Sequence, residues 1–159
     1  MSDARWFEIL ENVAAATEHF GRSVELYAAG GFSDADLAGY KAKMALMHAM
    51  QSGHTSMESA LVRVLGLVGE QPPSGPDWHA DLIARVSRAC GGRPAVLPPL
   101  IAKAANETRR FRHVAMRSYG IFETALARPA VLAAGALAGG LSAAMAEFRR
   151  KIDGEPPSG

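Results

Sequence analysis

Residues 37–68, LAGYKAKMALMHAMQSGHTSMESALVRVLGLV, decide the fold, because their stripe residues recur every three or four positions over about nine helical turns. This spacing is that of one face of an α-helix. The face consists of Leu37, Tyr40, Met44, Met47, Gln51, His54, Glu58, Leu61, Leu65 and Val68. Gln51, His54 and Glu58 interrupt it, and burying such groups without partners costs roughly 2–7 kcal/mol each. Either they find partners or line a cavity, or the helix bends near Gly53 and turns this side to water.

Segments with the same periodicity lie on both sides of this stretch. We expect helices over residues 3–29, 77–90, 98–120 and 129–152, separated by Gly30-Gly31, by PPSGP at 72–76 and by Gly91-Gly92. Ser33 is the predicted N-cap of the central helix, with Asp36 in its first turn. The first helix is expected to bury Phe7, Leu10, Ala14, Thr17, Gly21 and Val24, with Val13, Phe20 and Tyr27 widening this face. The last helix is expected to bury Leu137, Leu141, Met145 and Phe148.

The composition favours a helical protein of one domain. Alanine, the best helix former, occupies 30 of the 159 positions, and only 7% of the residues are aromatic. No stretch shows sustained strand alternation. We therefore predict an all-α, up-and-down bundle of about five helices, formed as a single domain by residues 1–153 and followed by a flexible tail at 154–159.

One segment has the length of a membrane span. Residues 129–146 carry no charge, but they are mostly alanine and glycine, and we predict a packed helix and no membrane. The N-terminus lacks the basic start and apolar core of a secretion signal, and the single Cys90 excludes an intrachain disulfide framework. A cytoplasmic protein is the expectation.

The net charge of +1 conceals two segments of opposite charge. Residues 1–40 hold seven acids against two arginines, and residues 103–117 hold five basic residues against Glu107. A basic cluster of this size indicates a site for a small anionic group or an acidic partner surface, and is too small to wrap a duplex. Glu11, Glu18 and Glu25 are spaced seven residues apart, which places them on one side of the helix. This indicates an acidic docking face or, as we favour, a solvated helix flank.

Common cofactor and metal motifs are missing from the sequence. Neither GxxxxGK[ST] nor GxGxxG occurs, and no histidine pair has HxxxH or HExxH spacing. The three periodic glutamates lack the Glu-x-x-His partners of a di-metal bundle. We therefore expect no metal and no cofactor.

The segment RRFRHVAMRSY at 109–119 carries the chemistry. On a helix, Arg112, Met116 and Tyr119 share one face, and Arg109, His113 and Arg117 share the neighbouring face. An imidazole that titrates near neutrality can act as general acid or base on RNA, while arginine holds the phosphate. The alternative to a catalytic role is a basic helix flank exposed to solvent, with Tyr119 packed into the core at the helix end.

Three stretches together resemble the HepT-like ribonuclease toxins of the HEPN superfamily. They are PSGPDWHADL at 73–82, RPAV at 93–96, and RFRHV at 110–114 followed by Tyr119. The similarity covers about residues 40–150. It implies a HEPN-like helical bundle with two long N-terminal helices.

The resemblance also implies roles for individual residues. The superfamily signature is an arginine, a polar residue after it and a histidine four to six positions beyond the arginine, with a tyrosine two residues later in HepT proteins. Arg112 and His113 match the first two, Tyr119 matches the tyrosine, and Arg117 stands at the histidine position. Arg112 and His113 are therefore the expected catalytic pair, and Tyr119 is the expected adenylylation site.

Other residues are expected to support this pair. Glu58 is a candidate charge partner of Arg112, or else a surface glutamate, and His54, Arg109 and Arg117 are candidates for lining the cleft. Trp78 and His79, at a predicted helix start, are interpreted as structural.

The expected partners are a second copy of the chain, an MNT-type nucleotidyltransferase antitoxin and RNA. The resemblance thus implies a metal-independent RNA endonuclease toxin of a toxin–antitoxin pair. Two alternatives stay open. Because of Arg117, the chain could be an inactive HEPN protein that binds a nucleotidyltransferase or nucleic acid; if the basic helix is merely solvated, it is a purely structural helical bundle.

Overall fold

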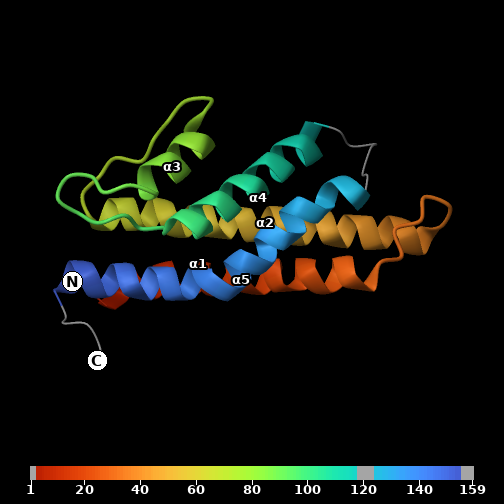
Figure 1. Ribbon diagram of the computed structural model, residues 1–159, viewed down its shortest axis with the longest axis horizontal. Helices are drawn as coiled ribbons and strands as arrows, with labels where there is room; N and C mark the ends of the chain where they lie inside the picture. The colour runs from red at the N-terminus through yellow and green to blue at the C-terminus, as the bar shows by residue number, and fades with distance from the viewer. Residues whose placement is uncertain (1–2, 118–123, 155–159) are drawn as a thin grey trace.

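The computed structural model describes residues 3–117 and 124–154. These residues form five α-helices and no strand, apart from an isolated antiparallel bridge between Cys90 and Arg93. The helices, shown in Figure 1, are α1 (Asp3–Ala29), α2 (Leu37–Leu67), α3 (Trp78–Val86), α4 (Pro99–Arg117) and α5 (Thr124–Asp153). The predicted all-α class is confirmed.

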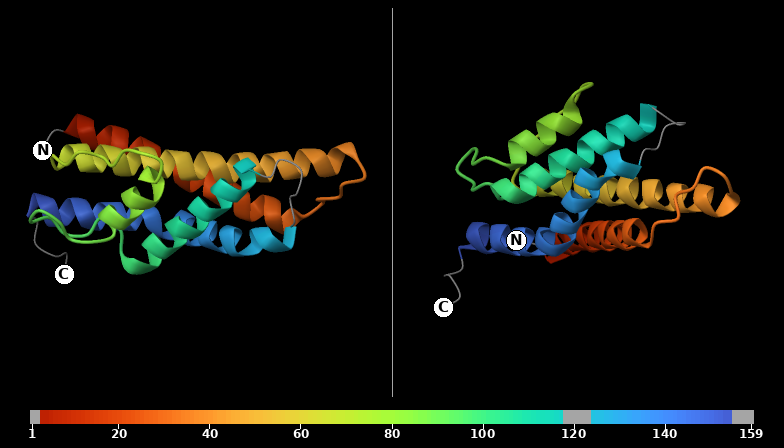
Figure 2. Two further views of the ribbon diagram at one scale, coloured as in Figure 1. Left: turned by 90° about the horizontal axis from the view of Figure 1, so that it is seen from above. Right: turned by 45° about the vertical axis from the view of Figure 1, so that its right-hand side comes forward.

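The two long N-terminal helices form the frame of the bundle. Helices α1 and α2 run side by side in opposite directions, and α5 packs along α1 (Figures 1 and 2). Helices α3 and α4 pack against α2 on its other side, and α4 also contacts α5. This arrangement brings α2, α3 and α4 together at one junction, where the polar part of the α2 stripe lies.

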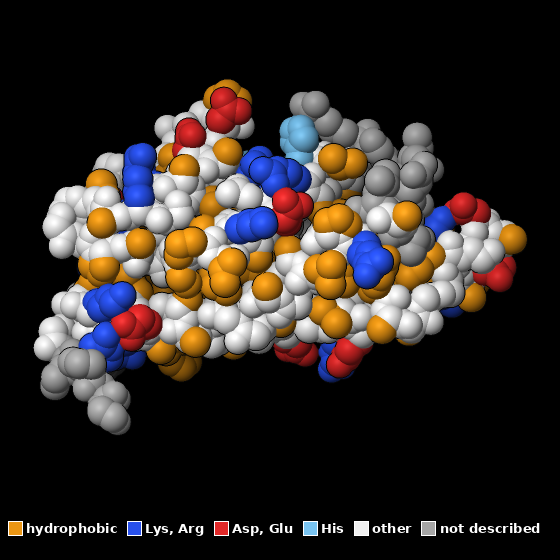
Figure 3. All heavy atoms as spheres, viewed as in Figure 1, with side chains coloured by type: hydrophobic (Ala, Val, Ile, Leu, Met, Phe, Trp, Pro, Cys, Tyr) orange, Lys and Arg blue, Asp and Glu red, His pale blue; other side chains and the backbone are white. Residues whose placement is uncertain are grey.

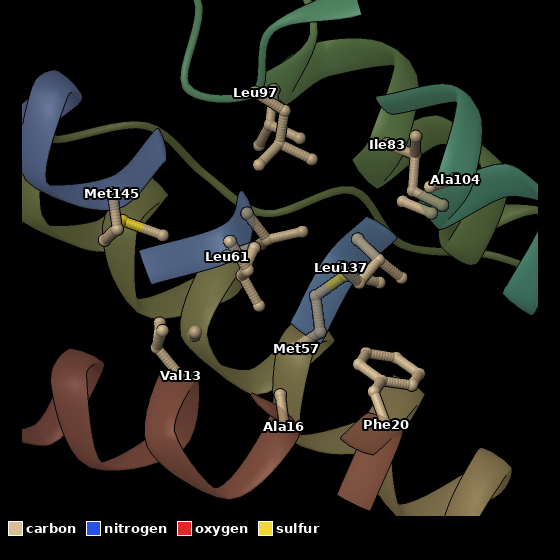
Figure 4. Packing of buried hydrophobic residues seen from close by; sticks show 14 of the residues in the cluster. Val13, Ala16, Phe20, Met57, Leu61, Ile83, Leu97, Ala104, Leu137 and Met145 are labelled. Atoms are coloured by element: carbon tan, nitrogen blue, oxygen red, sulfur yellow. The ribbon is translucent and has the colours of Figure 1, made fainter. Parts of the chain in front are cut away.

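One hydrophobic core draws side chains from all five helices. Figure 4 shows Phe20 of α1, Met57 and Leu61 of α2, and Leu137 of α5 directed toward one another. Ile83 of α3 and Ala104 of α4 close the core on the side of the candidate site.

The buried face of α1 lies one residue away from the predicted central stripe, while Val13 and Phe20, predicted to widen that face, are buried as expected. The buried side chains are Trp6, Ile9, Val13, Ala16, Phe20 and Ser23. Phe7 is 63% exposed, and Leu10 and Val24 are also exposed. Two apolar stripes lie next to each other on this helix, and the one that carries the large Trp6 and Ile9 side chains removes more apolar surface from water.

Two predicted boundaries of α2 and α3 need correction. Asp36, not Ser33, is the N-cap of α2, and its carboxylate accepts a hydrogen bond from the Gly39 amide at 2.8 Å. Helix α3 ends at Val86 and not near Cys90. The Arg93 guanidinium donates to the carbonyls of Arg85 and Arg88, so this side chain satisfies the end of the helix and the chain turns early.

Helix α5 begins at Thr124, five residues before the predicted start, and contains Pro129. Proline lacks the N–H that this sixth helical position would donate to the carbonyl four residues earlier, so α5 has one backbone hydrogen bond fewer in its second turn. The predicted end of α4 near residue 120 and most of the tail at 154–159 lie outside the described residues.

By length and composition, Ala127–Asp153 is a segment that could cross a membrane. In the bundle its predicted stripe is buried, with Leu137, Leu141, Met145 and Phe148 each at most 1% exposed. Packing against α1 and α4 therefore accounts for much of its apolar character.

Gly53 tests how closely α1 and α2 must approach. A Cβ at this position would lie 2.7 Å from the Phe20 ring, and Phe20 is fully buried. We expect Gly53→Ala to lower the free energy of unfolding by about 1–3 kcal/mol through overpacking, despite the better helix propensity of alanine. The control Gly139→Ala has open space around its Cβ and should stabilise α5 by at most about 1 kcal/mol. Urea unfolding measures both, and equal effects would contradict the steric argument.

Candidate functional site

Two of the three polar residues that interrupt the α2 stripe are buried in the folded protein, and Gln51 is half-buried. His54 is 0% exposed and Glu58 only 3%. They lie one turn apart on α2, where α3 and α4 cover this face. The bend toward water near Gly53 is therefore wrong, and the alternative, that these groups find partners, is confirmed.

Glu58 holds residues from both covering helices. Its Oε1 accepts a hydrogen bond from Arg112 Nη1 of α4 at 3.0 Å, which is the expected charge pair. Its Oε2 lies 2.5 Å from Nδ1 of His79 at the start of α3. One carboxylate thus connects α2, α3 and α4, and the surface alternative for Glu58 is wrong.

His54 lies next to the same carboxylate, one turn earlier on α2. Its Nδ1 lies 2.9 Å from the Thr108 hydroxyl, which itself donates to the Ala105 carbonyl. The Nε2 atom of His54 lies 3.5 Å from Glu58 Oε2.

The Glu58 carboxyl remains ionised in this setting. Burial alone would raise its pKa, but hydrogen bonds and charge from His54 and His79 bring the pKa below its usual value of 4.5. An ionised carboxylate only accepts hydrogen bonds. The Nδ1 atom of His79 must therefore carry the hydrogen, which leaves Nε2 as the free lone pair of the neutral ring.

A hollow of about 470 Å³ opens above this cluster, between α3 and α4. Its lining is His54, Pro76, Asp77, His79, Ala80, Arg109, Arg112 and His113. In Figure 3 a notch lies at the upper edge between α3 and α4, with a histidine on its α4 side and basic side chains below. The hollow thus combines three imidazoles with two guanidinium groups.

Arg112 occupies the centre of a longer polar surface. Its side chain also lines two neighbouring hollows of about 460 and 470 Å³, one toward Trp78 and one toward His19 and Gln51. Since Glu58 uses one of its nitrogens, the other donors of the guanidinium remain for a ligand.

The structure brings together five of the predicted site residues: His54, Glu58, Arg109, Arg112 and His113. Of these, Arg109 also donates to the Asn106 side chain, and His113 is exposed. Tyr119 and the side chain of Arg117 lie outside the described residues.

His79 belongs to this cluster although its sequence position predicted only a structural role beside Trp78. The two rings do stack, with centroids 3.7 Å apart. The polar residues on the α2 face were the available signal, since a buried glutamate needs more than one donor. Thr108, whose hydroxyl contacts His54, was not predicted as a member of the cluster either.

No group of histidine, cysteine, aspartate or glutamate side chains is arranged to hold a metal ion within residues 3–117 and 124–154. The acidic flank predicted on α1 is exposed at Glu11, Glu18 and Glu25.

Comparison with protein families gives one match. A family model described as HepT-like protein matches residues 45–152, which include all of α3 and α4 and every residue of the cluster. No curated protein and no solved structure matches the chain.

Glu58→Gln tests whether the buried carboxylate stabilises this junction. A carboxyl with a lowered folded pKa stabilises the fold above its unfolded pKa, and this contribution disappears as the pH falls through the folded value. We expect a loss of about 1–3 kcal/mol in the free energy of unfolding near neutral pH. The loss should shrink as the pH falls below the ordinary carboxyl pKa of 4.5.

Urea unfolding at a series of pH values measures this difference. The control Glu107→Gln removes a surface pair with Arg110 and should change the free energy of unfolding by less than about 1 kcal/mol. A Glu58→Gln effect that stays constant with pH would contradict the argument.

Proposed function

Because the chain belongs to the HepT-like family of HEPN proteins, we propose that it is an RNA endonuclease and the toxin of a toxin–antitoxin pair. The observation that carries the proposal is the hollow between α3 and α4, where Arg112, Arg109 and His113 face one space with His79. Guanidinium and imidazole groups together suit the cleavage of a phosphodiester beside a 2′-hydroxyl.

Arg112 is the proposed phosphate ligand. Glu58 fixes its guanidinium at 3.0 Å, which orders the side chain before RNA arrives. The remaining N–H groups bind the phosphate oxygens and stabilise the charge that develops on them in the transition state. Arg109, one turn before, adds positive charge to the same hollow.

His113 is the proposed proton-transfer group. It follows Arg112 directly on α4 and lines the hollow from the exposed side. An imidazole there can donate a proton to the leaving 5′-oxygen or accept one from the 2′-hydroxyl. Its role takes the place of the motif histidine, since the chain has Arg117 at that position.

The proposal includes partners. HepT-like proteins are associated with toxin–antitoxin systems, and we propose a cytoplasmic homodimer that binds an MNT-type nucleotidyltransferase antitoxin. Tyr119, two residues after Arg117, is the proposed acceptor of an adenylyl group.

Cleavage of RNA in the presence of a chelator tests the nuclease. We expect the purified protein to cut single-stranded RNA, and Arg112→Ala to lower kcat/KM by at least about 100-fold through loss of the phosphate ligand. The matched control is Arg110→Ala on the same helix, because Arg110 pairs with Glu107 at the surface outside the hollow. Its activity should stay within about twofold of the unsubstituted protein.

Absence of cleavage by the unsubstituted dimer would contradict the nuclease proposal. Binding of RNA or of a nucleotidyltransferase without cleavage would then favour the inactive HEPN protein. That alternative draws support from the arginine at residue 117.

A further inference from the structure

We propose that His79 is the general base of the reaction, with Glu58 as the group that positions its ring. This inference rests on the proposed RNA cleavage and adds a catalytic residue that lies on α3, outside the basic segment of α4. His79 is suited to the role by its hydrogen bond, its exposure and the hollow that it lines.

The hydrogen bond with Glu58 selects the tautomer of His79. The 2.5 Å contact joins Nδ1 to a buried carboxylate oxygen, and Arg112 Nη1, at 3.4 Å from Nδ1, has Glu58 as its own acceptor. Nδ1 is therefore the donor, and Nε2 is unprotonated in the neutral ring. Among the described residues, Nε2 makes no hydrogen bond.

The His79 ring is accessible to a ligand, and neighbouring side chains fix its orientation. The His79 side chain is 34% exposed and lines two hollows beside Arg112. Trp78 stacks on the imidazole with centroids 3.7 Å apart. A base held by a carboxylate on one nitrogen and directed to substrate by the other has the geometry required for proton abstraction.

The charged groups around the ring come from each element packed against it. Helix α2 supplies Glu58 and, through it, His54; helix α4 supplies Arg112, with Arg109 and His113 across the hollow; the turn before α3 supplies Asp77. The guanidinium groups favour a phosphate in the hollow, and the carboxylate of Glu58 compensates the charge that His79 gains when it takes a proton.

The imidazoles of His79 and His113 then divide the proton transfers. His79 Nε2 takes the proton of the 2′-hydroxyl, and O2′ forms a bond to phosphorus while the bond from phosphorus to O5′ breaks. His113 gives its proton to O5′. The products are a 2′,3′-cyclic phosphate and a 5′-hydroxyl end, and no oxidant or reductant is involved.

The variant His79→Asn separates catalysis from structure. The asparagine amide can donate to Glu58 from the place of Nδ1 but has no group that titrates in the place of Nε2. We expect near-normal thermal stability, a loss of at least about 100-fold in kcat, and disappearance of the acidic limb of the pH–rate profile. His48→Asn is the control, because His48 lies on α2 outside the hollow and contacts Ser52.

The cleavage assays distinguish failure of the His79 assignment from failure of the proposed function. If the unsubstituted protein cleaves RNA, Arg112→Ala does not and His79→Asn does, the inference about His79 is overturned while the proposed function stands. If the unsubstituted protein cleaves no RNA, the proposed function itself fails and the base assignment fails with it.

A measurement on the resting protein examines the geometry independently of activity. Nitrogen-15 spectra of the neutral imidazole distinguish the two tautomers, and we expect His79 to carry its hydrogen on Nδ1. Titration with inorganic phosphate should shift the His79 ring signals and leave those of His48 unchanged. A hydrogen on Nε2, or an unmoved His79 ring, would overturn the proposal.

Discussion

The site depends on the burial of one carboxylate. Glu58 lies on a mostly apolar helix face, and at 3% exposure it has almost no access to water. An ionised group in this position is tolerated only where hydrogen bonds and opposite charge replace its hydration. Arg112 from α4 and His79 from α3 supply them, and His54 adds support along α2. The need to satisfy Glu58 therefore brings three helices to one point.

This constraint also explains why the site is ordered in advance. An exposed arginine on a helix samples many rotamers, whereas Arg112 is tied to Glu58 and only 24% exposed. The same carboxylate sets the hydrogen of His79 on Nδ1 and turns the other nitrogen toward available space. Structural stability and the proposed chemistry thus rest on the same pair of hydrogen bonds. The hydrophobic core beneath, with Ile83 and Ala104, keeps α3 and α4 in place.

Much of the fold follows from periodicity. The helical segments, the glycine and proline breaks between them and the buried stripe of α5 were all predicted from residue spacing and composition. The failures are informative. On α1 two apolar stripes lie one residue apart, and spacing cannot choose between Phe7 and Trp6 without the neighbouring helices. The end of α3 depends on Arg93, whose guanidinium reaches back to helix carbonyls from beyond the glycine turn.

For the site, the sequence by itself determined which chemical groups are present and which polar side chains need partners on burial. It shows a basic segment with His113 and Arg112, and a glutamate and a histidine on an apolar stripe that require partners. Only the tertiary structure decided what those partners are, since residues 58, 79 and 112 lie on three helices that meet through packing. Contacts between side chains so distant along the chain leave no local pattern, and so His79 became visible only when α3 was placed against α2.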